Sequence, residues 1–369
     1  MGAKKKRCKN EKLNMRSEVK DRILYIDILR VVSILTVIVI HTSIVIVYGY
    51  FNANINWWWI GNFYTALSRW CVPIMVMISG ILLLDPNREY PTKIFIKKRF
   101  NKVVIPLIFW SIIYVIWRYR NDILVNKYPS LLSMVQSFIS GPVYYHLWFI
   151  YMILGLYILT PVLRVYIKNA DKENIKYFLV VWFITNGIIN FVEKLTNYDY
   201  KVGIELYFFT GYVGYYVLGY YLATSDFRKQ EKRLLYIMST VCIVATMIGT
   251  FILSKIKGTY VDNFNDFLFP NIIIMTIGVF VFIKSIDWER IIKRDSGINK
   301  FILDMSALSF GIYLIHLLVL EFLQNYYSID ARITNPLISI PFVSMVIMII
   351  SYIVIKFMKR LPIIEKFVP

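Results

Sequence analysis

Long apolar runs recur along the whole chain and set its organisation. Each run is close to the roughly 20 residues that an α-helix needs to cross a membrane. Short polar segments separate the runs, and none is long enough to form a separate domain. The pattern predicts an all-α, polytopic bundle of about ten transmembrane helices. The ten expected helices cover residues 25–48, 63–84, 103–119, 143–163, 177–194, 206–224, 234–254, 269–286, 304–326 and 337–357.

Positive charge is divided unevenly between the two sets of connecting segments. Of the 42 lysine and arginine residues, 32 fall in segments on the side of the N-terminus and 8 in segments on the other side. Because lysine and arginine concentrate in cytoplasmic loops, both termini are expected in the cytoplasm. The expected organisation is a basic cytoplasmic segment (1–22), a membrane domain (23–358) and a short cytoplasmic tail (359–369).

The composition is typical of a membrane protein and argues against several other classes of protein. The chain is 58% hydrophobic and has a mean hydropathy of +0.57, far more apolar than a soluble domain of this length. The net charge of +19 follows from the basic cytoplasmic segments, so no nucleic-acid partner is expected. Cys8, Cys71 and Cys242 show no paired spacing, which favours neither a disulfide framework nor a metal site. Phosphate-loop and zinc-protease motifs are absent from the sequence.

The first apolar run contains ionisable residues at both ends. Asp27 and Arg30 are spaced i, i+3 and share one helix face. His41 follows Arg30 by 11 residues, which is within about 20° of three full turns and rises about 16 Å. One alternative is structural: Asp27 pairs with Arg30 at the interface and His41 bonds a neighbouring helix. The other is functional, because ionisable groups at membrane depth often face a wet cavity.

All three histidines of the chain, His41, His146 and His316, lie in or at expected membrane helices. Imidazole suits proton transfer near neutral pH. A histidine bonded to Tyr313 or Glu321 for structural reasons would nevertheless give the same sequence. The basic stretch after the second run has two similar interpretations. It either fixes membrane topology or binds a polyphosphate-bearing donor, and charge alone does not separate the two.

These features occur in an order that resembles the acyltransferase-3 family of integral membrane acyltransferases, over about residues 23 to 358. The segment H-L-W-F and the lack of an extra domain are most similar to the standalone branch that O-acetylates cell-surface glycans such as enterobacterial common antigen. The matching motifs are D-x-x-R-x10-H (Asp27, Arg30, His41), R-x-x-V-P-x-x-x-x-I-S-G (Arg69 to Gly80), K-K-R before I-P-L (Lys97 to Leu107), H-L-W-F (His146 to Phe149) and S-x-x-x-Y-x-x-H (Ser309, Tyr313, His316).

The resemblance implies an O-acetyltransferase with His41 as the catalytic histidine and Arg30 as its partner. Acetyl-coenzyme A would be the cytoplasmic donor, with no permanently bound cofactor. The acceptor would be a hydroxyl of a cell-surface polysaccharide or its lipid-linked precursor, at a bacterial plasma membrane. A partner protein in envelope polysaccharide assembly is an alternative route to completing the transfer. Supporting or substrate-binding roles are expected for Asp27, Arg69, Ser79, Lys97, Arg99, His146, Trp148, Tyr313 and His316.

Two other classes of function stay open at this stage. The chain would also suit a transporter or flippase for a small metabolite or a glycan intermediate. A transporter has no need of an acyl donor and, unless coupled to protons, tolerates loss of His41. A structural membrane partner in a polysaccharide-export complex would tolerate loss of all three histidines.

Overall fold

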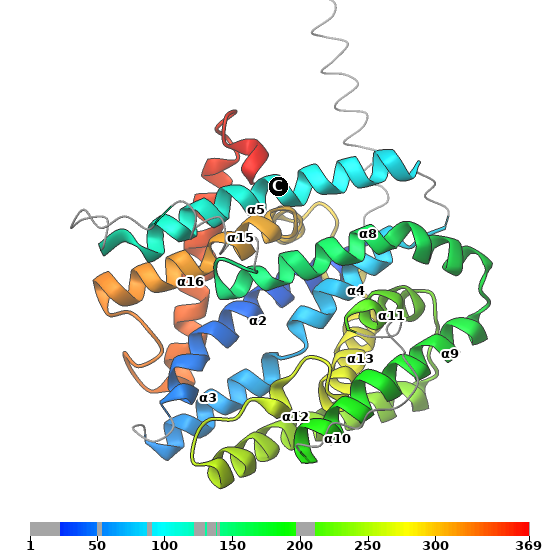
Figure 1. The fold of residues 1–369 in the computed structure, drawn as a ribbon, viewed down its shortest axis with the longest axis horizontal. Coiled ribbons are helices and arrows are strands. Elements are labelled where there is room, and N and C mark those ends of the chain that lie inside the picture. The colour runs from blue at the N-terminus through cyan, green and yellow to red at the C-terminus, as the bar shows by residue number, and fades with distance from the viewer. Residues whose placement is uncertain are drawn as a thin grey trace, which may run out of the picture.

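The computed structural model describes residues 23–49, 54–86, 91–121, 130, 138, 141–196 and 211–368. Within these ranges the regular structure is helical and contains no strand, and the helices form a single bundle (Figure 1). Nine helical segments of the described part are long and apolar enough to cross a membrane. The expected all-α, multi-pass membrane architecture is therefore confirmed.

The principal helices run in chain order through the bundle. They are α2 (Leu24–Tyr48), α3 (Ile55–Ser68), α4 (Cys71–Leu83), α5 (Thr92–Arg118), α8 (Trp148–Asn169), α9 (Lys172–Trp182), α10 (Asn190–Thr196), α11 (Val213–Ala223), α12 (Lys229–Lys257), α13 (Pro270–Ser285), α14 (Trp288–Ile291), α15 (Gly297–Tyr327) and α16 (Pro336–Met358). A π-helix, η2 (Phe183–Ile189), joins α9 to α10, and 3-10 turns cover η1 (Tyr145–Leu147), η4 (Asn263–Asn265) and η5 (Glu365–Phe367). Of the expected helix 206–224, only α11 lies within the described residues.

Two of the helix boundaries that differ from the sequence prediction affect the placing of candidate residues. The second membrane segment begins at Ile55, not at residue 63, and is interrupted between α3 and α4. Arg69 is therefore near the middle of this segment. The basic stretch Lys97 to Lys102 belongs to helix α5 and is not a loop. Its exposed lysines extend the helix beyond the apolar run, so a hydropathy window places the helix start too late.

Helix α2 lies at the centre of the bundle. It packs against α3, α4, α15 and α16, and its Leu29, Ile34 and Ile38 are fully buried. It contains no proline or glycine, so its backbone hydrogen bonding continues through 25 residues. The fold thereby holds Arg30 and His41 on one continuous helix.

Helices α4 and α11 approach each other closely through two glycines. A Cβ atom on Gly80 would lie 1.9 Å from the carbonyl oxygen of Tyr216, and one on Gly219 would lie 2.3 Å from that of Met77. Small residues allow such close contact between membrane helices. This contact fixes α4, which carries Ser79, against the rest of the bundle.

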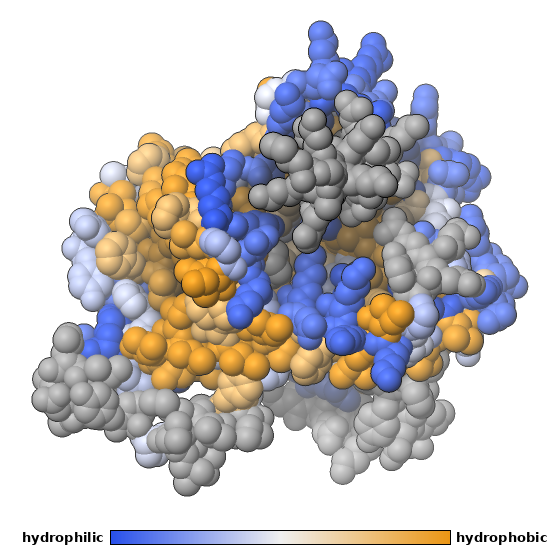
Figure 2. Space-filling view, turned by 90° about the horizontal axis from the view of Figure 1, so that it is seen from above, coloured by the Kyte–Doolittle hydropathy of each residue, from blue (hydrophilic) through white to orange (hydrophobic). Residues whose placement is uncertain are grey.

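Hydrophilic and hydrophobic side chains occupy different regions of the surface. The start of α5 and the end of α8 lie at the same side of the bundle, at the right in Figure 1. Seen from above, hydrophilic residues gather at the upper and right-hand parts of the molecule, and hydrophobic residues cover much of the left part (Figure 2). The apolar area is what a helix bundle exposes to lipid.

Candidate functional site

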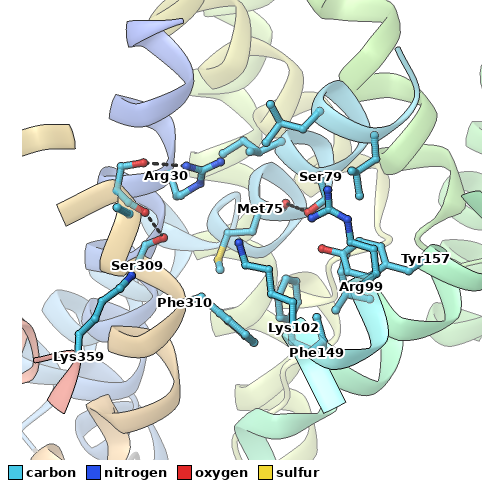
Figure 3. A pocket seen from close by; sticks show the side chains of 17 residues that line it. Arg30, Met75, Ser79, Arg99, Lys102, Phe149, Tyr157, Ser309, Phe310 and Lys359 are labelled. Atoms are coloured by element: carbon cyan, nitrogen blue, oxygen red, sulfur yellow. Dashed lines mark hydrogen bonds between the residues drawn. The ribbon is translucent and has the colours of Figure 1, made fainter. Parts of the chain in front are cut away.

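A cavity of about 510 Å³ opens near the beginning of α2. Its walls come from α2, α4, α5, α8 and α15, together with Lys359 just after α16. Figure 3 shows side chains from these elements bordering a common space. A cavity of this size matches the volumes of ordinary small-molecule sites. We call it the basic pocket because four cations line it: Arg30, Arg99, Lys102 and Lys359.

Arg30 is held in place by two polar groups. Its Nη1 donates to Ser306 Oγ at 2.8 Å and lies 3.4 Å from Asp27 Oδ1. Ser306 Oγ donates in turn to the same carboxylate oxygen at 2.5 Å. The Asp27 side chain is 6% exposed and that of Arg30 is 25% exposed. Asp27 therefore anchors Arg30 from behind and leaves part of the guanidinium facing the pocket.

The other three cations come from α5 and from the residue just after α16, and they face the same pocket. Arg99 and Lys102 extend from α5, while Lys359 approaches from the opposite side (Figure 3). The guanidinium of Arg99 also lies near the rings of Phe95 and Tyr157, at 5.8 and 6.0 Å from their centroids. No carboxylate is among the described residues that line the pocket. Such a site favours a ligand with several negative charges, and phosphate groups suit it best.

The remaining walls of the basic pocket are apolar or weakly polar. Met75, Phe149 and Phe310 line it, and Ser79 and Ser309 add hydroxyl groups. The Ser79 hydroxyl donates to the Met75 carbonyl within α4. This combination suits a ligand with a charged head and a less polar extension.

The three histidines lie close together near His41, on the same face of α2 as Arg30 and about three turns further along the helix. The ring centroids of His41 and His316 are 5.3 Å apart, and those of His146 and His316 are 5.4 Å apart. His316 is fully buried, His146 is 2% exposed, and His41 is half-buried. We call these three residues the histidine cluster. Helices α2 and α15 and turn η1 each contribute one member.

Tyr313 lies between the basic pocket and the histidine cluster. Its ring is 5.4 Å from that of Phe149, which lines the pocket, and 5.5 and 5.6 Å from His146 and His316. Its hydroxyl donates to the carbonyl of His146. Two side chains, Phe149 and Tyr313, therefore separate the basic pocket from the histidine cluster.

Arg69 and Trp148 form a separate group. Arg69 Nε donates to Asn265 Oδ1 at 3.2 Å, and its guanidinium is 5.6 Å from the Phe267 ring centroid. Trp148 packs against the same Phe267 ring at 6.0 Å. Asn265 is 2% exposed and also donates to Thr250. Arg69, in the break between α3 and α4, is thus held by a hydrogen bond to the buried side-chain amide of Asn265.

The residues singled out from the sequence fall into distinct places. Arg30, Ser79 and Arg99 line the basic pocket, with Asp27 behind Arg30. His41, His146, His316 and Tyr313 come together in and beside the histidine cluster. Lys97 is exposed on α5 and does not line the pocket. The sequence analysis included Lys102 only as one residue of the basic stretch, and it missed Ser306 and Lys359, because lysines and serines at membrane-helix ends carry no distinctive motif.

One comparison with known proteins identifies the family. The sequence profile of Acyl_transf_3, described as an acyltransferase domain, matches residues 23–356. No curated protein and no solved structure matches the chain. Because the profile covers nearly all of the sequence, the chain belongs to the acyltransferase-3 family. It is therefore a multi-pass membrane protein with an acyltransferase domain.

Proposed function

We propose that this acyltransferase is an O-acetyltransferase of a bacterial plasma membrane. It moves an acetyl group from cytoplasmic acetyl-coenzyme A to a hydroxyl of a cell-surface polysaccharide or its lipid-linked precursor. One observation carries the proposal. The basic pocket lies at the Arg30 end of the α2 stretch from Arg30 to His41, and the three histidines gather at its His41 end.

The basic pocket is suited to the donor. Coenzyme A carries phosphates at one end and a flexible, less polar arm that ends in the thioester. Arg30, Arg99, Lys102 and Lys359 would pair with the phosphates, because guanidinium and ammonium groups form charge-assisted hydrogen bonds with phosphate oxygens. Ser79 and the apolar wall would contact the arm. Lys97, which is outside the pocket, is left without a proposed contact.

The histidine cluster is suited to the transfer step. Arg30 and His41 are separated by about 16 Å along α2, which is comparable to the reach of the coenzyme A arm. A donor whose phosphates pair with Arg30 can therefore present its thioester close to His41. His41 either takes the proton of the acceptor hydroxyl or carries the acyl group itself. Arg30 is too far away to contact the same carbonyl.

The acceptor would approach from the side of the histidine cluster. Trp148 follows His146 by two residues at the start of α8, and Trp148 and Arg69 both contact the Phe267 ring. An aromatic ring and a guanidinium are groups that bind sugar faces and acidic sugar substituents. We therefore assign Arg69, Trp148 and His146 to the acceptor side. The chain would act alone or with a partner in envelope polysaccharide assembly.

The deciding experiment measures acyl transfer by purified protein in lipid nanodiscs. Radiolabelled acetyl-coenzyme A is added to wild type, His41→Ala, Arg30→Ala and the matched control Lys300→Ala, a lysine exposed at the start of α15. We expect coenzyme A release with wild type and Lys300→Ala. His41→Ala should lose turnover, and Arg30→Ala should lose donor affinity. A wild type that neither binds nor turns over the donor would contradict the proposal and favour transport of a metabolite or glycan intermediate.

A further inference from the structure

His316 has the most defined environment in the histidine cluster. Its Nδ1 lies 2.6 Å from the carbonyl oxygen of Tyr313, one turn earlier on α15. A carbonyl oxygen only accepts hydrogen bonds, so Nδ1 carries the proton of the neutral ring. Nε2 then holds the lone pair, because the two ring nitrogens of a neutral imidazole differ in this way. Helix α15 thus fixes one tautomer.

The lone-pair nitrogen of His316 has no partner in the described part of the chain. Nε2 is buried and makes no hydrogen bond there, and the whole residue is 0% exposed. A buried polar atom without a partner costs free energy, which a hydroxyl group donated by a ligand would recover. The ring lies beside His41, the proposed reaction centre, at 5.3 Å between centroids.

His146 also has buried ring nitrogens without a hydrogen-bond partner in the described part of the chain, but no hydrogen bond there fixes its tautomer. Its ring is surrounded by tyrosine rings, with centroids 4.9 Å from Tyr114, 5.5 Å from Tyr313, 5.8 Å from Tyr144 and 6.2 Å from Tyr145. These aromatic neighbours enclose the His146 ring without selecting which of its nitrogens carries the proton. His316 is the member of the cluster with an oriented ring and an available lone pair.

We propose that His316 is the general base that takes the proton of the acceptor hydroxyl, an inference that rests on the proposed acyl transfer. The hydroxyl oxygen attacks the acyl carbon and forms the ester C–O bond while its proton moves to Nε2 of His316. The bond from the acyl carbon to the leaving group breaks, and its electron pair goes to the sulfur of coenzyme A or to a nitrogen of acylated His41. The proton then passes from His316 to that leaving group.

A conservative substitution separates this role from a structural one. His316→Asn retains a side-chain N–H near the position of Nδ1, so the bond to Tyr313 can be kept, but it has no lone pair at the position of Nε2. Hydroxylamine provides the second readout, because its nitrogen attacks acyl groups without general-base help. The control is Tyr352→Phe, which removes a hydroxyl that bonds Asp304 on the α15–α16 contact away from the cluster.

The experiment measures two products from acetyl-coenzyme A in nanodiscs. With methyl β-glucoside as the acceptor, His316→Asn should lose about 10²–10⁴-fold in rate, the usual range for general-base catalysis. With hydroxylamine, it should form acetyl hydroxamate close to the wild-type rate. The Tyr352→Phe control should keep both activities.

Each other result overturns the inference in a recognisable way. If His316→Asn acylates the glucoside at the wild-type rate, His316 is not the base. If it loses both products equally, its role is structural or concerns the donor. If wild-type protein releases coenzyme A with neither nucleophile, the proposed function itself fails, and the assignment of His316 fails with it.

Discussion

Around Arg30, a carboxylate and a hydroxyl on two different helices hold one guanidinium. Ser306 belongs to α15, whereas Asp27 and Arg30 belong to α2. Hydrogen bonds that involve charged groups contribute more than neutral ones, about 1.5–3 kcal/mol each. The orientation of Arg30 therefore depends on Asp27, although Asp27 need not contact the donor.

Replacing Asp27 tests this dependence. Asp27→Asn should weaken donor binding by roughly 10-fold, since the guanidinium loses its charged anchor at a cost of about 1.4 kcal/mol. Titration of coenzyme A into the purified protein measures the Kd. Ser306→Ala should have a smaller effect in the same direction. An unchanged Kd in both variants would contradict the idea that donor binding depends on how Arg30 is held.

Lys102 and Lys359 give a second test at the level of single residues. Lys359→Ala and Lys102→Ala should each raise the Kd for coenzyme A by about 3- to 10-fold, and both should reduce its dependence on salt, because they remove a cation from a phosphate site. Lys300→Ala serves as the charge-matched control. Equal effects of all three substitutions would indicate a general surface-charge effect instead.

Single residues were only partly predictable from the sequence. The motifs singled out Arg30, Arg99, Ser79 and the three histidines, and the histidines stood out because ionisable side chains within apolar runs are conspicuous. Lys102 and Lys359 were not distinguishable from the other lysines of the segments expected in the cytoplasm, which the positive-inside rule already explains. That His41 and His316 meet depends on how α2 and α15 cross, and no local pattern encodes that crossing.

At the scale of the elements, the contact between α4 and α11 depends on the absence of side chains at Gly80 and Gly219. Gly219→Ala should destabilise the fold by about 1–3 kcal/mol, because the new methyl group would meet the carbonyl oxygen of Met77 and overpacking has costs of this size. Thermal unfolding in detergent measures the change. Gly155→Ala is the matched control: it lies on the exposed face of α8 with nothing near its position and should not lower stability.

The element boundaries show where hydropathy patterns fail. The run of apolar residues predicted the existence of the described membrane helices, because each must bury its backbone polar groups internally. It did not predict the interruption at Arg69 or the early start of α5. At both places charged residues lower the average hydropathy, so a hydropathy window resolves neither the turn at Arg69 between α3 and α4 nor the helical residues before the apolar run of α5.

For the whole molecule, the charge distribution predicts that the start of α5 faces the cytoplasm and the start of α3 faces outward. Asn54→Cys should react with a membrane-impermeant maleimide added to intact cells, in a background without the native cysteines. Lys93→Cys should react only after permeabilisation. The opposite pattern would invert the predicted orientation and with it the side from which the basic pocket is reached.

Helix α2 has a mechanical consequence for the bundle. It is an uninterrupted helix of 25 residues without glycine or proline, so it behaves as a rigid strut between the two regions it joins. Because the helix is stiff, the distance between Arg30 and His41 stays constant. Any movement that admits or releases a ligand must then come from the elements around α2, and the interrupted segment α3–α4 is the natural place for such bending.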